Sequence, residues 1–325
     1  MLRRRFTATL AGLGVATLAA PLVRAQAWPA RSIRYIVPVA AGGGSDLVGR
    51  TVTDRWAKAL GQNFVVENIG GGGGAIACQT TAKAAPDGYT LLQGYVATHG
   101  TSPATRSKLP YDPIRDFTPI GMIGATPNVL VVNASLPITS VAEFTDWLRR
   151  NEARASYGSA GQGSLTHLTM ELYKQATTTN PVHAPYRGIA PAFTDLLAGQ
   201  TQAMFPGLAA ALPHIRSGKV RALAVTGSAR HPALKDVPTM VEAGFKDFVI
   251  EGWYGVFAPA RTPRAIADRL SAEINKALRH PESMERWKTL GFDPIGSTPD
   301  ALSERQRGDL DYWRRMIEFT GVKVE

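Results

Sequence analysis

A strand, a glycine-rich turn and a helix follow one another without a break in residues 33–60, and this order restricts the fold more than any other feature. Strand-forming side chains occupy residues 33–37, and Gly42, Gly43 and Gly44 then leave the backbone bare. Apolar side chains recur at helical spacing after the turn; they are Val48, Val52, Trp56 and Leu60. A helix start whose N–H groups are unpaired and not covered by side chains is a potential anion-binding site. The segment therefore predicts a β–α unit whose turn can receive a small acidic solute.

Strands and helices alternate along the rest of the chain, which predicts an α/β fold with mostly parallel sheets flanked by helices. A second glycine turn, residues 158–164, follows a strand and precedes a helix that Ser164 is expected to cap. In a doubly wound sheet both turns lie at the carboxyl ends of strands, where ligands bind. Together they could hold one carboxylate between two helix starts without an arginine. Either turn alone has a simpler interpretation as a tight turn, and the pair leaves both interpretations open.

Further elements are predicted from the signals at their ends. Ser140 and Glu143 form a capping box that opens a helix, and Pro263 and Pro299 each follow a threonine cap at the start of another helix. Residues 94–110 are expected to be a long polar loop, and loops of that length are often functional.

Residues 1–27 have the composition of an export signal. Arg3, Arg4 and Arg5 form a basic start, and the apolar stretch that follows is too short to span a membrane. Small residues before Gln26 and Trp28 offer cleavage sites. We therefore expect a protein matured in the periplasm, with the Sec and Tat routes both open. An uncleaved anchor is the alternative interpretation.

Cysteine count and charge narrow the class of protein. The single cysteine, Cys78, rules out an internal disulfide and a lipid anchor after the signal, and its place in a predicted helix indicates burial. The net charge is +10; without the four arginines of the signal, 32 basic side chains remain against 26 acidic ones. This mild excess favours anions, but no basic stripe interleaved with aromatics supports nucleic-acid binding. About 300 mature residues suit two domains.

Motifs of the common enzyme classes are missing from the sequence. No serine has the flanking glycines of a nucleophile elbow, and the glycine runs complete neither a phosphate-binding loop nor a dinucleotide fingerprint. The histidines are scattered without His-x-x-x-His spacing, so no metal site or cofactor is expected. His99 and His167 could bond a ligand, although a surface or capping role is more common. The chain is therefore expected not to be an enzyme; a secreted hydrolase is the alternative that predicts turnover.

Over its whole mature length the chain resembles the Bug family of extracytoplasmic solute receptors, which serve tripartite tricarboxylate transporters. The matching stretches occur in order along the chain. They are Gly42-Gly-Gly-Ser-Asp46 with Arg50, Val65-Val-Glu-Asn68, Asp87-Gly-Tyr89, Leu109-Pro-Tyr-Asp-Pro113 with Asp116-Phe-Thr-Pro-Ile120, Tyr157-Gly-Ser159 with His167-Leu168, Pro185-Tyr-Arg-Gly188, Arg221-Ala-Leu-Ala-Val-Thr226 and Val237-Pro-Thr-Met240.

The resemblance implies a two-domain Venus-flytrap fold, with residues 28–126 and 251–325 in one domain and residues 127–250 in the other. It implies a monomeric periplasmic receptor that captures a small carboxylate in the cleft between the domains and delivers it to a membrane permease. A receptor that presents its ligand to a membrane signalling sensor is the alternative, and the sequence does not separate the two.

The expected ligand-binding residues come from both glycine turns and from the loop after residue 94. Ser159 is expected to turn its hydroxyl toward the ligand, so that Ser159→Ala weakens binding and leaves the melting temperature nearly unchanged. Asp46 is expected mainly to pair with Arg50 at i,i+4, since its charge repels an anion. The full set is Ala41, Gly42, Gly43, Gly44, Ser45, Asp46, Tyr95, Thr98, Ser159, Ala160, Gly161, Gln162, Gly163, Ser164 and His167, with Gly188 from a stretch that matches the family and Phe205 from the strand where the chain departs from it.

Three departures from the family pattern leave the identity of the ligand open. Val39 stands where an aromatic side chain is common, which reshapes the first turn. Pro206 and Gly207 follow Phe205, where the family often has an acidic or polar residue. The glycine run at 70–74 replaces a segment that usually contains arginine and proline.

Overall fold

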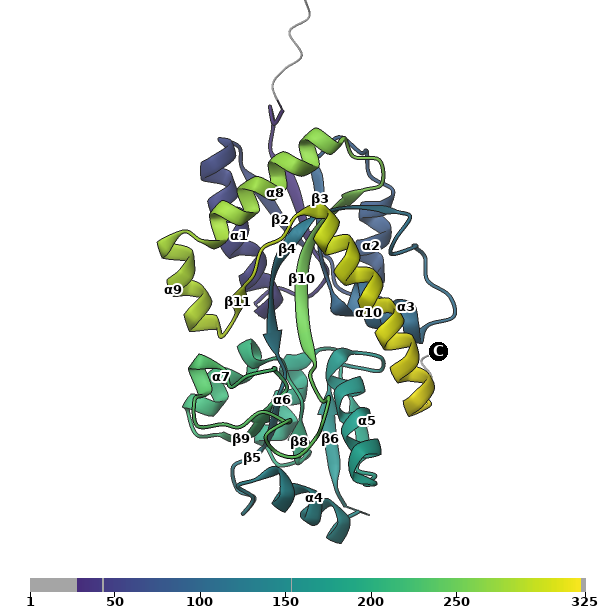
Figure 1. The fold of residues 1–325 in the computed structure, drawn as a ribbon, viewed down its shortest axis with the longest axis vertical. Coiled ribbons are helices and arrows are strands. Elements are labelled where there is room, and N and C mark those ends of the chain that lie inside the picture. The colour runs from purple at the N-terminus through teal and green to yellow at the C-terminus, as the bar shows by residue number, and fades with distance from the viewer. Residues whose placement is uncertain (1–27, 43, 153, 323–325) are drawn as a thin grey trace, which may run out of the picture.

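The computed structural model describes residues 28–42, 44–152 and 154–322, so the expected signal at 1–27 lies outside the described residues. These residues form two mixed sheets, one above the other in Figure 1, each flanked by helices. We call the two halves the upper lobe and the lower lobe.

The upper lobe is built on a sheet of six strands in the order β11-β4-β10-β3-β1-β2. The strands are β1 (Ile33–Val37), β2 (Phe64–Asn68), β3 (Thr90–Tyr95), β4 (Phe117–Pro127), β10 (Glu251–Pro259) and β11 (Asp293–Pro294). Helices α1 (Gly44–Leu60), α8 (Arg264–Leu278) and α9 (Pro281–Leu290) pack with one face, and α2 (Ala75–Ala82) and α10 (Pro299–Thr320) pack with the other. The short α3 (Ser102–Thr105) lies beside α10.

The lower lobe is built on a sheet of five strands in the order β7-β6-β8-β5-β9. The strands are β5 (Val129–Asn133), β6 (Ser156–Ser159), β7 (Val182–Pro185), β8 (Ala203–Met204) and β9 (Val220–Val225). The helices are α4 (Val141–Arg150), α5 (Leu165–Thr177), α6 (Ile189–Leu197) and α7 (Leu208–Arg216). Alternate side chains of β5 pack with α6 and α7 on one face and with α4 and α5 on the other, so this strand is buried on both sides.

Helix α1 is held against the sheet by its apolar face, and this fixes where its first turn lies. Val48, Val52 and Trp56 are at most 1 % exposed and pack against Ile33, Tyr35 and Val37 of β1. Burying side chains of this size contributes roughly 2–3 kcal/mol each, as an upper estimate. The predicted strand, turn and helix are therefore confirmed as one anchored unit.

Both sheets are mixed, whereas the alternation of elements predicted mostly parallel sheets. Strand β1 is parallel to β2 and β3, but β10 is antiparallel to β3 and β4 because it returns from the lower lobe. Strand β4 was not expected at all, and the loop predicted at 94–110 contains a π-helical turn, Ala97–Thr101, followed by α3. Strand β4 forms because it pairs along its whole length with β10, which lies far along the chain at Glu251–Pro259 and so gives no local signal.

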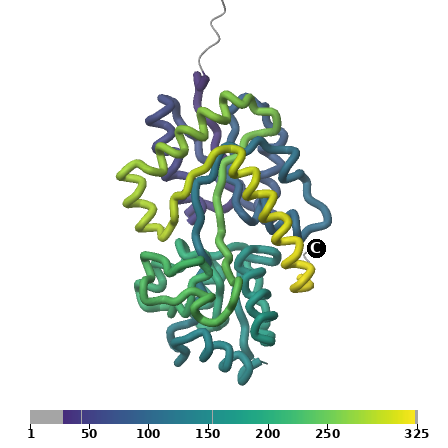
Figure 2. Tube along the Cα trace, viewed as in Figure 1, coloured from purple at the N-terminus to yellow at the C-terminus, as the bar shows by residue number. Residues whose placement is uncertain are grey.

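Two neighbouring strands carry the chain between the lobes (Figure 2). Strand β4 ends beside Glu251 and continues through Asn128 into β5. Thr226 connects the two crossing segments, Asn128 between β4 and β5 and Ile250 directly before β10. Its hydroxyl accepts the Asn128 N–H at 2.9 Å and donates to the carbonyl of Ile250. Helix α10 runs past this junction and contacts α5 of the lower lobe.

Candidate functional site

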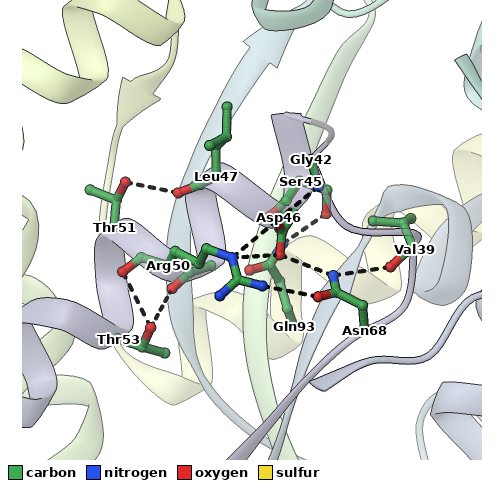
Figure 3. Close-up of polar contacts among 11 residues, drawn as sticks. Val39, Gly42, Ser45, Asp46, Leu47, Arg50, Thr51, Thr53, Asn68 and Gln93 are labelled. Atoms are coloured by element: carbon green, nitrogen blue, oxygen red, sulfur yellow. Dashed lines mark hydrogen bonds and ion pairs between the residues drawn. The ribbon is translucent and has the colours of Figure 1, made fainter. Parts of the chain in front are cut away.

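The first glycine turn, which we define as residues 41–46, is organised around the carboxylate of Asp46 (Figure 3). Asp46 is only 3 % exposed and accepts the N–H of Gly42 at 2.9 Å, Nδ2 of Asn68 at 3.0 Å and Nε of Arg50 at 3.1 Å. Burial alone raises the pKa of Asp46, but the bonds from Arg50, Gly42 and Asn68 outweigh it and lower the pKa. The expected pair with Arg50 is confirmed, and the carboxylate supports the turn instead of facing a ligand.

The N–H groups of this turn are not all available to a ligand. That of Gly42 is occupied by Asp46, and Gly43 lies outside the described residues. Within the described ranges, no acceptor takes the N–H of Gly44 or Ser45, which open α1. The first two N–H groups of the helix are therefore free donors of the turn, at the end where the helix dipole is positive.

A buried glutamine on β3 supports the same helix start. Nε2 of Gln93 donates to both the carbonyl and the hydroxyl oxygen of Ser45, each at 2.8 Å, and Oε1 accepts the Tyr35 hydroxyl at 3.1 Å. Gln93 was not among the expected residues. Its signal was visible in the sequence, because it interrupts an apolar strand with a polar side chain that needs buried partners.

The second glycine turn, which we define as residues 159–164, satisfies most of its own N–H groups. Ser164 caps α5 as predicted, since its hydroxyl accepts the N–H of His167 at 3.3 Å. The N–H of Ala160 donates to Thr166 Oγ1 at 2.9 Å, and that of Gly161 donates to Ser159 Oγ at 3.1 Å. The N–H of Gly163 donates to a ring nitrogen of His167, and that of Ser164 to the carbonyl of Gly161. Of this turn's amides, only that of Gln162 has no partner among the described residues, so the turn offers fewer free donors than expected.

The stacked rings of Tyr157, His183 and His167 pack beside the second turn. The ring centroid of His183 lies 4.8 Å from that of Tyr157 and 4.0 Å from that of His167. Nε2 of His183 is 2.7 Å from the Ser159 hydroxyl oxygen. Burial, with a contribution from the neighbouring His167, lowers the pKa of His183 to about 4, and burial also lowers the pKa of His167. Both rings are therefore neutral near pH 7, which leaves Nδ1 of His167 able to accept from Gly163.

Four of the expected ligand-binding side chains are buried and already have partners within the protein. Ser159 is fully buried, and its hydroxyl is committed to Gly161 and His183. Thr98 is also fully buried, with its hydroxyl bonded within its own turn. Phe205 has no exposed surface and packs between Tyr173 and Phe248 in the core. His167 is 6 % exposed and holds Gly163. Each of these side chains is already engaged in packing or in local hydrogen bonds.

Most of the remaining expected residues keep exposed or half-buried positions, but Gly163 is buried with its N–H bonded to His167. Ala41, Gly42 and Gln162 are exposed, and Ala160, Gly161, Ser164 and Gly188 are half-buried. Gly188 precedes α6 with φ 129° and provides no side-chain cap, and among the described residues no acceptor takes the N–H of Ile189 or Ala190. The ring of Tyr95 is half-buried and stacks on Tyr254 at 6.1 Å.

The two lobes approach each other at helix starts. A side-chain carbon placed on Gly44 would lie 3.6 Å from Cβ of Ala209, in the first turn of α7. Gly207 precedes α7 without a side-chain cap. Where β10 enters the upper lobe, a carbon placed on Gly252 would lie 3.3 Å from Leu165 at the start of α5. The first glycine turn therefore faces α7, an element the sequence did not connect with the site.

Other features of the described residues lie away from these turns. A hollow of about 600 Å³ is lined by the loop around residues 106–116 and by Leu310 and Arg314 of α10. It contains none of the expected ligand-binding residues. No group of three or more His, Cys, Asp or Glu in the described part of the chain could hold a metal ion. No helix there is long and apolar enough to cross a membrane.

Known proteins match this chain over nearly all of its length. Residues 48–322 match the family described as the tripartite tricarboxylate transporter family receptor. Protein BugT of Bordetella pertussis is 35 % identical over 317 residues, which cover 97 % of both chains. R. palustris Rpa4515 with adipate is 33 % identical, with a TM-score of 0.88 over 91 % of this chain and 99 % of that chain. MatC from Rhodopseudomonas palustris with bound malate is also 33 % identical, with a TM-score of 0.83 over 89 % of this chain and 100 % of that one.

These matches share the two-domain α/β fold and the class of protein, which binds solutes and is not enzymatic. The chain therefore belongs to the tripartite tricarboxylate transporter receptor family and is a periplasmic solute-binding protein of that family.

Proposed function

We propose that this protein binds a small carboxylate between its two lobes and delivers it to a membrane permease of the tripartite tricarboxylate type. The observation that carries the proposal is the pair of free N–H groups at Gly44 and Ser45, on a turn already organised by Asp46. Two such donors at a helix start favour an oxygen anion without a cation. Adipate and malate, bound by two similar proteins, are dicarboxylates of this kind.

The position of α7 supports a site shared by both lobes. Gly44 and Ala209 approach within contact distance at the first turns of two helices, so an anion near them would feel both positive helix ends. The uncovered start of α6 after Gly188 is a further source of donors in the lower lobe. A ligand held by both lobes favours the closed arrangement over an open one by its differential affinity.

We also propose that the lobes are the domains expected from the sequence, residues 28–126 with 251–325 and residues 127–250. The crossings then lie at Ala125–Asn128 and close to Gly252, where β4 and β10 run side by side. The bonds of Thr226 to Asn128 and Ile250 hold the two crossing strands together. Closure about this paired junction would move the lower lobe as one body.

Titration calorimetry on the mature protein tests the carboxylate proposal. The panel is malate, adipate, citrate and benzoate, with the diamide of malate as the neutral control. We expect at least one carboxylate to bind and its neutral analogue not to bind. Binding by none of the four would refute the proposal.

A charge-bearing variant tests the location of the site. Ala209→Glu adds a carboxylate beside Gly44, and we expect it to weaken binding about tenfold or more through like-charge repulsion. Ala301→Glu is the matched control, because it adds the same group to the exposed first turn of α10. Equal affinity of the two variants would place the site elsewhere.

Delivery to a permease is tested separately by capture of the membrane complex on the immobilised, ligand-loaded protein. Recovery of a permease subunit supports the proposed partner. Recovery of a sensor kinase in its place would favour a signalling receptor.

A further inference from the structure

The buried amide of Gln93 faces the start of α1 in one defined orientation. Gln93 has no exposed surface, and its Nε2 lies 2.8 Å from the carbonyl oxygen of Ser45. A carbonyl oxygen only accepts hydrogen bonds, so the NH₂ end of the amide must point at Ser45. The other end, Oε1, accepts the hydroxyl of Tyr35 at 3.1 Å. The Tyr35 hydroxyl can donate or accept, so the contact with the Ser45 carbonyl sets this orientation, and Tyr35 then donates to Oε1.

Gly49 lets α1 lie directly against the Gln93 amide. A side-chain carbon at Gly49 would lie 2.6 Å from Oε1 of Gln93 and 3.2 Å from the ring of Tyr35. Gly49 lies in the second turn of α1, so the glycine lets the helix approach the Gln93 amide closely. The contact between helix and strand is therefore built around this side chain.

This orientation decides the role of the Ser45 hydroxyl. Nε2 of Gln93 also lies 2.8 Å from Oγ of Ser45, which must accept that hydrogen bond. A hydroxyl that accepts from a neighbour keeps its own proton to donate. In the part of the chain that the structure describes, no acceptor takes the Ser45 hydroxyl proton. Ser45 is half-buried at the turn that faces α7, so the proton is available there.

We propose that Gln93 is a positioning residue that makes Ser45 an obligatory hydrogen-bond donor to a ligand carboxylate. Tyr35 fixes the amide, the amide fixes the hydroxyl oxygen, and the hydroxyl donates to the anion beside the N–H groups of Gly44 and Ser45. This inference rests on the proposed function, because it assigns a role toward the same ligand. Gln93 would thus act on the ligand through Ser45, without contacting the ligand itself.

A double-mutant cycle with calorimetry tests the role, using the tightest-binding carboxylate of malate, adipate, citrate and benzoate as the probe. Ser45→Ala removes the donor and should weaken binding about tenfold or more, since hydrogen bonds to charged groups are strong. Gln93→Met keeps the shape, frees the hydroxyl and should weaken binding about threefold to tenfold. In the Ser45→Ala background, Gln93→Met should have no further effect on affinity, because the hydroxyl it positions is gone.

Two further variants separate positioning from a general loss of structure. Tyr35→Phe keeps the ring and removes only the far bond of the amide, so it should weaken binding about twofold, and only when Ser45 is present. It replaces Gln93→Met if thermal melting shows that variant to be unfolded. Ser45→Thr keeps the hydroxyl and should restore binding relative to Ser45→Ala.

The outcomes are distinct. Affinity losses that multiply in the Ser45→Ala, Gln93→Met double variant would show that Gln93 acts on the fold generally and would overturn the inference. Unchanged affinity in Gln93→Met or in Ser45→Ala would overturn it as well. If the wild type binds no carboxylate, the proposed function and this inference are refuted together. If the wild type binds but the affinity losses of the two variants multiply in the double variant, the inference alone is refuted.

Discussion

Replacement of Asp46 by alanine is the sharpest test of how the first glycine turn is held. The carboxylate is 3 % exposed and accepts bonds from Gly42, Asn68 and Arg50 at 2.9–3.1 Å. Asp46→Ala removes all of these acceptors at once. The N–H of Gly42 loses its only partner among the described residues, and Nδ2 of Asn68 loses one of its two acceptors.

The expected loss of unfolding free energy follows from these contacts. Each hydrogen bond from Gly42 and Asn68 to a buried carboxylate contributes about 1.5–3 kcal/mol. The pair with Arg50 adds only about 0.5 kcal/mol, because the arginine side chain is 47 % exposed and screened by solvent. Relief of the burial of the charge offsets part of the sum. We therefore expect Asp46→Ala to lower the unfolding free energy by about 2–4 kcal/mol.

Urea denaturation near pH 7.5 measures this loss, and Arg50→Met is the matched control. The control removes only the exposed ion pair and should cost about 0.5 kcal/mol or less. Because the folded pKa of Asp46 is lowered, its contribution is present above about pH 4 and is lost as pH falls through the folded pKa. If Asp46→Ala and Arg50→Met prove equally stable, the carboxylate does not organise the turn and the reasoning fails.

Two further predictions concern the second turn and a buried histidine. Ser159→Ala removes the hydrogen-bond partner of the Gly161 N–H and of the His183 ring, so it should lower the melting temperature by about 2–4 °C and weaken ligand binding at the same time. An unchanged melting temperature in calorimetry would restore the serine to a ligand-facing role. His99 is fully buried, and burial lowers its pKa to about 3, so the folded protein binds fewer protons than the unfolded chain below about pH 6.5. Stability should therefore fall by about 2–3 kcal/mol between about pH 7 and pH 4.5 on account of this group. In His99→Phe that part of the acid sensitivity should vanish, and denaturation curves of equal pH dependence in both proteins would contradict the assignment.

Local signals in the sequence predicted the elements around the site well. Ser140 and Ser164 both cap the helices that they were expected to cap, because capping depends on neighbours within three residues. The pair of Asp46 with Arg50 formed for the same reason, as the two residues share one face of a helix. The strand, turn and helix at residues 33–60 likewise follow from local apolar spacing.

The availability of individual groups was not predictable in the same way. Whether a backbone N–H is free depends on acceptors such as Thr166 and Asp46, whose side chains turn toward it only in the folded chain. His183 reaches Ser159 from a neighbouring strand, 24 residues further along the chain. Phe205 was an expected ligand contact but lies in the core, because Tyr173 and Phe248 pack against it. Sequence spacing carries no information on such contacts.

The sequence by itself determined the type of building block, the family and the two turns at which a ligand carboxylate is expected. These depend on local spacing, on glycine and on the order of motifs. Only the tertiary structure decided that the first turn keeps its donors at Gly44 and Ser45, that the second turn uses most of its own, and that α7 faces the first turn. The physical reason is that a nearby side chain turns toward an N–H only in the folded turn, and that distant elements such as α1 and α7 meet only when both lobes are folded.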